Sequence, residues 1–357
     1  MIANIIASVP AILFHFHKEG SVSAIILAII VGTILITMYT RFFNSFPGMT
    51  LPELLKNTTS KWFYKSFVFF LAIVWFVAGL ITLVTFTFLL IRFLTPEMPI
   101  IQICLTIMIP ALFGSLMKTE RILYTLEILI LIGFPIIVFV FYKAYSSDKL
   151  EWAFVKDAAL YFNQLPNLHA FSACFYLFLG VANLFIFNRF FTEKQNFNWK
   201  NVLFIGLLST LALFTTYFIP IGFNGLDHIE ELVYPWISTS DSLRMDFFLI
   251  ERVLFVFLIL YVGIAFLSIM IHWHVSLEFF NSIFNLEKVK FKGIAIGKLI
   301  VILLYVGVSL FFVRKLNEYQ LFLFTSLFYD MLIIFFPSML LLFFFIKRGM
   351  KNVKKAK

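Results

Sequence analysis

Residues 66–91 read SFVFFLAIVWFVAGLITLVTFTFLLI and contain no charged side chain. As an α-helix this stretch would be about 39 Å long at ~1.5 Å per residue, enough to cross the ~30 Å hydrocarbon core of a bilayer. The whole chain has this character, because 62% of its 357 residues are hydrophobic and only 13% are charged. A soluble domain usually carries about 25% charged residues. The sequence therefore predicts an all-α polytopic membrane protein whose helices are surrounded by lipid.

About ten apolar stretches of this kind are separated by polar segments. We expect transmembrane spans at roughly 1–16, 21–40, 66–91, 98–117, 122–142, 168–188, 201–222, 245–272, 295–313 and 321–346. The first span is abbreviated, since only 14 residues precede His15, and it also contains Pro10. We therefore expect either a half-helix at this position or a sequence that begins later than that of the ancestral protein.

The ten predicted spans form one membrane domain, residues 1–346, followed by a basic tail, residues 347–357. They permit a five-plus-five division into repeats at about 1–142 and 168–346. Repeats with an odd number of spans have inverted topology, as in many secondary transporters. The sequence shows no evident internal repeat, so this part of the architecture is predicted by analogy.

Basic residues alternate between the gaps that separate the spans. One set of gaps, with the tail, carries eighteen Lys and Arg residues against four acids, whereas the opposite set carries eight against eleven. The basic set is Arg41, Lys56, Lys61, Lys65, Lys118, Arg121, Arg189, Lys194, Lys200, Lys288, Lys290, Lys292, Lys347, Arg348, Lys351, Lys354, Lys355 and Lys357. Cytoplasmic loops retain Lys and Arg, so we expect both termini in the cytoplasm.

The same distribution argues against other classes of function. The net charge of +9 gathers at the edges of the spans, which indicates orientation in a membrane and not nucleic-acid binding. The sequence contains no phosphate-binding loop, nucleophile motif or HExxH motif, so we expect neither catalysis nor a cofactor. Two His-x-His motifs, at His15/His17 and His272/His274, lie at predicted span ends. Residues two apart on a helix face ~200° apart, so we expect interfacial anchors and no metal site.

Charged side chains inside predicted spans are candidates for function. Asp330 lies nine residues into the last span, where its carboxyl group would either carry a coupled proton or ligand, or form a hydrogen bond between helices. Glu251 and Arg252 lie early in the eighth span and point ~100° apart, which favours ion pairs with neighbouring helices or a place in the outer vestibule. Glu127 lies five residues from the inner start of its span, where hydration from the cytoplasm is expected.

Three short blocks of sequence resemble one family. Residues 46–54 read FPGMTLPEL and are followed by Lys61-Trp62, which is similar to the segment after the second span in the B subunits of bacterial spore germinant receptors. Those subunits belong to the amino acid–polyamine–organocation transporter superfamily. Residues 234–237, YPWI, and 248–252, FLIER, follow in the order that the family uses around its eighth span. The resemblance covers nearly the whole chain.

The resemblance implies a ligand site between broken first and sixth helices. The family's Gly-x-Gly-Ile/Leu-Leu-x-x-Pro break corresponds here to residues 3–10, ANIIASVP, in which only the proline is retained. The family's Gly-x-Glu in the sixth span corresponds to residues 180–182, GVA, so its carboxylate is absent. The candidate substrate-binding residues are Asn4, Ser8, Phe178 and Gly180. The departures suggest an altered ligand, or a role that depends on a partner.

The resemblance further implies a B-type receptor subunit that binds a small nutrient, expected to be an amino acid, and helps to trigger germination. The expected partners are an A subunit with soluble domains, a C lipoprotein and the lipid of the spore inner membrane. The rival hypothesis is an amino acid transporter coupled to a proton on Asp330 or Glu251. A third is a scaffold that binds no ligand and only stabilises its complex.

Overall fold

The computed structural model describes residues 1–244, 251–291 and 294–355. Within these ranges, eight helices are long and apolar enough to cross a bilayer. Two shorter apolar helical segments, Ala3–His15 and Ile100–Ser115, stand at the first and fourth predicted spans. The predicted class, an all-α polytopic membrane protein, is confirmed.

The elements follow the predicted order of spans. The first part contains η1 (Ile2–Ile5), α1 (Ser8–His15), α2 (Ser21–Asn44), α3 (Leu51–Thr58), α4 (Lys61–Phe93), α5 (Ile100–Ser115), α6 (Thr119–Tyr145), α7 (Trp152–Ala159) and η2 (Leu160–Asn163), where η denotes a 3₁₀ helix. The sixth span comprises α8 (Leu168–Phe175), η3 (Tyr176–Asn183), α9 (Leu184–Phe187) and η4 (Asn188–Phe190). The remainder is α10 (Trp199–Asn224), η5 (Ile229–Glu231), α11 (Pro235–Ser242), α12 (Val253–Phe284), η6 (Leu286–Lys288), a short antiparallel pair of β1 (Lys290–Phe291) and β2 (Ile294–Ala295), α13 (Gly297–Lys315) and α14 (Glu318–Lys355).

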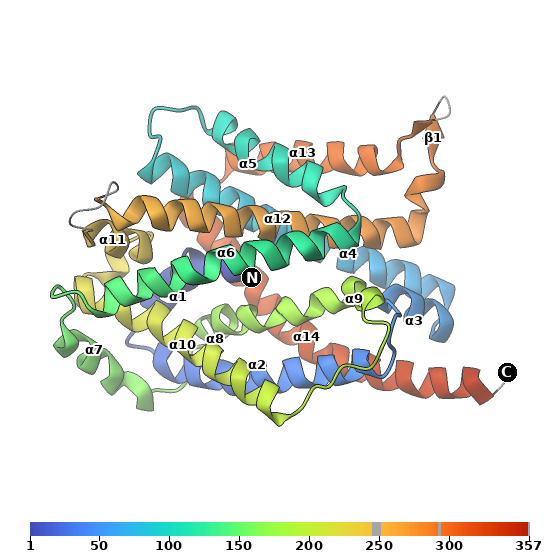
Figure 1. Ribbon diagram of the computed structural model, residues 1–357, viewed down its shortest axis with the longest axis horizontal. Helices are drawn as coiled ribbons and strands as arrows, with labels where there is room; N and C mark the ends of the chain where they lie inside the picture. The colour runs from blue at the N-terminus through green and yellow to red at the C-terminus, as the bar shows by residue number, and fades with distance from the viewer. Residues whose placement is uncertain (245–250, 292–293, 356–357) are drawn as a thin grey trace.

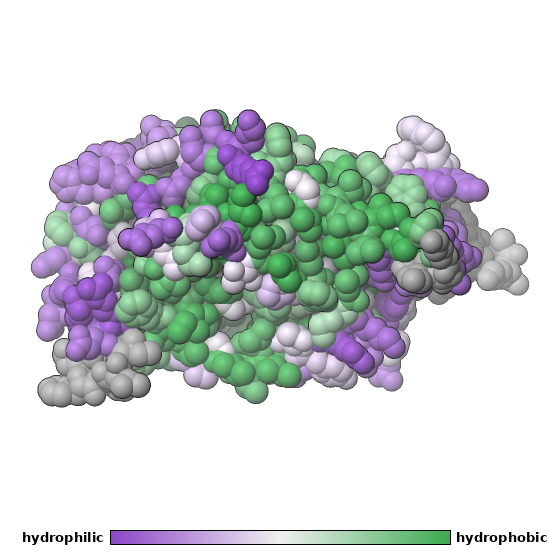
Figure 2. All heavy atoms as spheres, turned by 90° about the horizontal axis from the view of Figure 1, so that it is seen from above, coloured by the Kyte–Doolittle hydropathy of each residue, from purple (hydrophilic) through white to green (hydrophobic). Residues whose placement is uncertain are grey.

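The long helices lie along the long axis of the molecule (Figure 1). Hydrophilic residues gather at the two ends of this axis, and a hydrophobic band covers the surface between them (Figure 2). Many of the most exposed large side chains in this band are Leu, Ile and Phe. A surface of this kind is stable in lipid and unstable in water, which agrees with the predicted membrane domain.

Contacts between loops confirm that alternate gaps lie at opposite ends of the bundle. Arg189, after the sixth span, forms an ion pair with Glu53, after the second, with 2.8 Å between Nη2 and Oε1. Arg92, at the end of α4, is paired with Glu318 at the start of α14, with 2.5 Å between Nη1 and Oε2. We call the end that carries Arg189 the basic end and the end that carries Arg92 the acidic end.

The helices α4 and α12 form the most extensive contact in the bundle. Ser276 Oγ donates a hydrogen bond to the carbonyl of Ala72 at 2.5 Å, and the indole of Trp273 donates to the carbonyl of Phe76 at 3.3 Å. The helices approach closely at Gly79, where a Cβ atom would lie 2.5 Å from Trp273 Nε1. Small residues permit such close packing between membrane helices.

The eighth span differs from its predicted bounds. It was predicted at 245–272, whereas α12 runs from Val253 to Phe284; residues 245–250 lie outside the described ranges. His272 and His274 are therefore buried within the helix, each 2% exposed, and the prediction that they anchor a span end is wrong. The helix continues past them because its polar side chains bond to neighbouring helices, which local hydropathy does not reveal.

The last span also continues beyond its predicted end at residue 346. The helix α14 extends to Lys355, so the basic tail is helical as far as the structure describes it. This extension packs against α3, since a Cβ atom at Gly349 would lie 3.1 Å from the side chain of Thr58. The tail is therefore held at the basic end by the short helix that follows the second span.

Candidate functional site

The first span is interrupted near its start. The helix η1 ends at Ile5 and α1 begins at Ser8, and Ala7 between them has φ −107° and ψ −86°, outside the helical region. Pro10 lies in the first turn of α1, where the missing N–H costs no helical hydrogen bond. The predicted break in the first helix is therefore present in the backbone, although the glycines of the family pattern are absent.

Asn4 and Ser8 flank this break and point to the same hydroxyl group. Asn4 Nδ2 donates a hydrogen bond to the hydroxyl of Tyr329 at 3.1 Å, and Ser8 Oγ lies 3.0 Å from the same oxygen. All three side chains are completely buried, at 0% exposure. Asn4 Oδ1 is buried as well and has no hydrogen-bond partner in the described part of the chain. Tyr329 belongs to α14 and was not among the predicted site residues.

The sixth span passes this cluster as a 3₁₀ helix. Eight residues, Tyr176–Asn183, form η3 in the middle of the span, in place of the expected unwound break. A long 3₁₀ stretch inside a helix is uncommon and often marks a hinge. The ring of Tyr176, the first residue of η3, stacks on Tyr329 with 4.2 Å between ring centroids. The first, sixth and last spans thus meet at Tyr329.

The other two predicted binding residues lie elsewhere on η3. Phe178 is 1% exposed and packs against α2, where a Cβ atom at Gly32 would lie 2.2 Å from its ring. The nearest atom to a Cβ at Gly180 would be Met1 Cγ, at 3.8 Å. Met1 itself lies near the middle of the bundle in the ribbon view (Figure 1). The structure brings Asn4 and Ser8 together but directs Phe178 and Gly180 to different neighbours.

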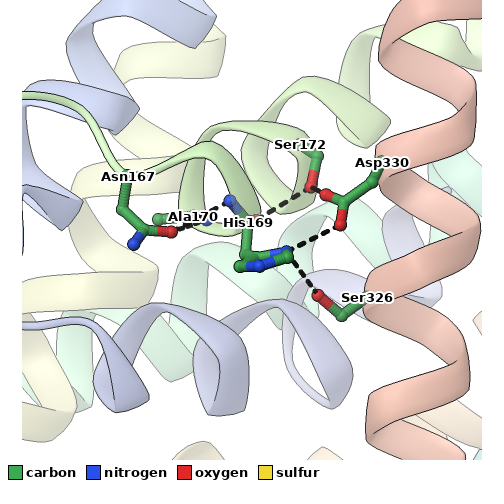
Figure 3. A network of polar contacts seen from close by, with 6 residues as sticks. All are labelled: Asn167, His169, Ala170, Ser172, Ser326 and Asp330. Atoms are coloured by element: carbon green, nitrogen blue, oxygen red, sulfur yellow. Dashed lines mark hydrogen bonds and ion pairs between the residues drawn. The ribbon is translucent and has the colours of Figure 1, made fainter.

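Asp330 forms a polar network with the start of the sixth span (Figure 3). His169 Nδ1 lies 2.6 Å from Asp330 Oδ2, and the Ser172 hydroxyl donates to Asp330 Oδ1 at 2.5 Å. Ser326, one turn before Asp330, lies 3.3 Å from the same His169 nitrogen. Asn167 caps α8 by accepting hydrogen bonds from the backbone amides of residues 169 and 170. We call His169, Ser172 and Asp330 the acid–histidine latch.

The latch joins α14 to the acidic-end start of α8. The Asp330 side chain is 18% exposed and that of His169 is 40% exposed, so the pair lies at the surface of the bundle near this end. Phe16, directly after α1, stacks on the imidazole of His169 with 5.5 Å between ring centroids. Asp330 is therefore not isolated in the hydrocarbon core, because its partners lie in the first two turns of the sixth span. A histidine two residues after a capping asparagine was the available signal for this partner.

The other predicted charged residues lie at the periphery. Glu127 is exposed on α6, about 12 Å from the start of that helix, where its carboxylate can reach the interface. Glu251 and Arg252 precede α12 and are exposed, so their predicted place inside the eighth span is wrong. Arg252 pairs with Asp241 at 3.5 Å, which is an ion pair at the acidic end. The apolar sequence before residue 251 had suggested a longer membrane helix.

A polar cavity of about 210 Å³ lies at the basic end, between α3, α4, η4 and α12. Its wall includes the Glu53–Arg189 pair, and Glu53 also completes a capping box with Thr50 at the start of α3. Burial raises the pKa of Glu53, but hydrogen bonds from Thr50 and the nearby Arg189 outweigh it and hold the pKa below its usual value. Glu53 is thus an ionised anchor between α3 and the end of the sixth span.

Comparison with known families gives one match. The sequence profile of the family described as spore germination protein matches residues 20–309. The chain belongs to the spore germination protein family. This membership confirms the resemblance seen in the three short blocks. The matched range includes Phe178 and Gly180 but not Asn4, Ser8 or Asp330. Searches of curated proteins and of solved structures return no match.

Proposed function

We propose that this membrane protein of the spore germination family is the B-type subunit of a germinant receptor, and that it senses a small nutrient, an amino acid. The ligand binds between the first and sixth spans, at Asn4 and Ser8. Binding alters the contacts among the first, sixth and last spans, and the chain passes this change to partner subunits without catalysing a reaction. The orientation that we propose places both termini in the cytoplasm and the protein in the spore inner membrane.

One observation carries this proposal. A fully buried amide and hydroxyl, on Asn4 and Ser8, flank a break in the first span and lie against the 3₁₀ stretch of the sixth. One of these groups, Asn4 Oδ1, is buried without a partner among the described residues, which is costly unless a ligand supplies a donor. In membrane transporters such helix interruptions hold the substrate. Membership of the germination family supports a role for the chain in germination, and the match includes the 3₁₀ stretch of the sixth span.

The proposed partners are an A subunit with soluble domains and a C lipoprotein. A surface at the basic end supports such an assembly, because α3 and the end of α14 lie together there and carry exposed lysines such as Lys56 and Lys351. A change at the sixth span reaches this surface through the Arg189–Glu53 ion pair. The partner would thus read the state of the ligand site from the cytoplasmic side.

Germination assays test the proposal directly. Spores that lack this chain, and spores in which it is restored, are exposed separately to each of the twenty protein amino acids. We expect the response to at least one amino acid to disappear and return with the chain. Restoration with Asn4→Ala should raise the concentration that gives a half-maximal response. An identical response with and without the chain, to every amino acid, would refute the sensing role.

A transporter coupled to protons is the second candidate. The observation in its favour is the acid–histidine latch, because Asp330 and His169 form a partly exposed hydrogen-bonded pair of an acid and a base, and such pairs serve as proton relays in membrane transporters. Vesicles that contain this chain alone, loaded with buffer and given a pH gradient, distinguish the two functions. Accumulation of a radiolabelled amino acid against its gradient would favour transport, whereas binding without accumulation favours a receptor.

A further inference from the structure

The hydrogen-bonding groups of the proposed nutrient site are held by another part of the chain. The Tyr329 hydroxyl lies 3.1 Å from Asn4 Nδ2 and 3.0 Å from Ser8 Oγ, and it comes from the last span, more than 300 residues away. All three groups are at 0% exposure, so water does not compete for them. The hydroxyl oxygen accepts from the Asn4 amide and thereby takes the place that an oxygen of a ligand would occupy.

The tyrosine satisfies only one end of the asparagine. Asn4 has a donor end, Nδ2, and an acceptor end, Oδ1. The donor is used by Tyr329, while the buried acceptor has no partner among the described residues. A buried acceptor without a partner is unfavourable, so this side chain favours a ligand that brings a donor beside its own acceptor.

We propose that Tyr329 is a tethered competitor for the nutrient, which binds by displacing the tyrosine hydroxyl. This inference rests on the proposed function and specifies its ligand as a small zwitterion. A ligand carboxylate accepts from Asn4 Nδ2 and from the Ser8 hydroxyl, and the ligand ammonium donates to Asn4 Oδ1. A carboxylate is a stronger acceptor than a phenol hydroxyl, and this difference, with the bond from the ammonium group to Asn4 Oδ1, offsets the cost of moving the zwitterion from water into the site.

The displacement is linked to the sixth span by two neighbouring contacts. The Tyr329 ring stacks on Tyr176, the first residue of η3. The next residue, Asp330, bonds to His169 and Ser172 in α8. A shift of α14 that frees the hydroxyl therefore changes both contacts at once. The last span thus competes with the ligand and also reports its arrival.

The test compares two tyrosine variants in spores that contain the complete receptor. Tyr329→Phe removes the hydroxyl and retains the ring that stacks on Tyr176. Tyr217→Phe is the matched control, because Tyr217 is also buried and stacks on a ring of the first span, Phe14, while its hydroxyl has no partner in the described ranges. The probes are the twenty protein amino acids, and the readout is the concentration that gives a half-maximal germination response.

We expect Tyr329→Phe to lower the half-maximal concentration about tenfold, the effect of about two modest hydrogen bonds, and Tyr217→Phe to leave it unchanged. A residue with a purely structural role would weaken the response when altered, so the direction of the change is decisive. If Tyr329→Phe does not accumulate in spores, binding of the radiolabelled amino acids to the purified wild-type and Tyr329→Phe chains in detergent serves as a second measurement, with tighter binding expected for the variant.

If Tyr329→Phe, at normal protein level, leaves the half-maximal concentration unchanged or raises it, the role of Tyr329 as a competitor is refuted. A double variant, Asn4→Ala with Ser8→Ala, separates this failure from failure of the site itself. If the double variant raises the half-maximal concentration while Tyr329→Phe has no effect, the proposed site is supported and the role of Tyr329 as a competitor is refuted. If neither the double variant nor Tyr329→Phe alters the response to any amino acid, the proposed nutrient site and the competitor are both refuted.

Discussion

Replacement of Asp330 by asparagine tests whether the acid–histidine latch joins the last span to the sixth. Asparagine retains the shape of the side chain and one oxygen that can accept from Ser172. It removes the charge and places either an NH₂ group or a neutral oxygen opposite His169 Nδ1. The two carboxyl oxygens of Asp330 contact both neighbours, at 2.6 and 2.5 Å, whereas an amide presents one oxygen and one NH₂ group and serves both neighbours less well.

The expected loss of stability follows from these contacts. A hydrogen bond to a charged group contributes about 1.5–3 kcal/mol in buried surroundings. The His169 side chain is 40% exposed, so solvent screens the pair and we expect about 1–2 kcal/mol. For a chain of 357 residues that corresponds to a fall in melting temperature of roughly 1–3 °C. Ser326→Ala removes only the 3.3 Å contact and should cost under ~0.5 kcal/mol.

Thermal unfolding of the purified chain in detergent, followed by size-exclusion chromatography of the remaining folded protein, measures these shifts. The decisive comparison is a double-mutant cycle of Asp330→Asn and His169→Ala. If the two side chains act on each other, the double variant loses about 1 kcal/mol less than the sum of the single variants. Strictly additive losses, or an Asp330→Asn protein as stable as the wild type, would show that the latch does not hold the two spans together.

Three further predictions address the helix packing, the basic end and the proposed site. Gly79→Ala should destabilise the protein by about 1–3 kcal/mol, because its Cβ would lie 2.5 Å from Trp273 Nε1, whereas Gly263→Ala, with no neighbouring atom within 4 Å, should be neutral or slightly stabilising in the same melting assay. The pKa of Glu53 is lowered in the folded state, so the stabilising effect of its carboxylate is complete above the usual carboxyl pKa and is lost as the pH falls through the lowered value. Between pH 7 and pH 4, the melting temperatures of wild type and Glu53→Gln should therefore approach each other only at the acidic end of the range. Gly180→Trp, at normal protein level, would crowd Met1 at the start of the first span, because a Cβ at residue 180 would lie 3.8 Å from Met1 Cγ, and it should weaken the germination response. An unchanged response would favour a scaffold that binds no ligand.

The membrane-spanning architecture could be predicted from the sequence with little error. Each span is a local property, because roughly twenty apolar residues favour the hydrocarbon core wherever they lie in the chain. The alternation of basic gaps likewise predicted which loops share an end, and the Arg189–Glu53 and Arg92–Glu318 pairs confirm that grouping. The bounds of α12 were mistaken because polar residues in its second half are bonded to neighbouring helices.

The contents of the candidate site were predicted only in part. Asp330 could be singled out because charged groups in apolar segments are rare and costly. Asn4 and Ser8 were indicated only by the resemblance to the family. Their partners could not be named: Tyr329 lies 325 residues from Asn4, and His169 lies 161 residues from Asp330. A tyrosine such as Tyr329 inside an apolar segment is unremarkable by itself. The capping Asn167 before His169 indicates the start of a helix but not the residue that the imidazole contacts.

What the sequence alone determined is thus which segments enter the membrane and which ends they share, because the transfer of a helix into lipid depends on that helix and on its flanking charges. Only the tertiary structure decided which faces meet. Helix rotation and register depend on how all the side chains of neighbouring spans pack together, and in lipid, where apolar faces are nearly equivalent, a few close approaches and hydrogen bonds such as those of Tyr329 select one arrangement among many.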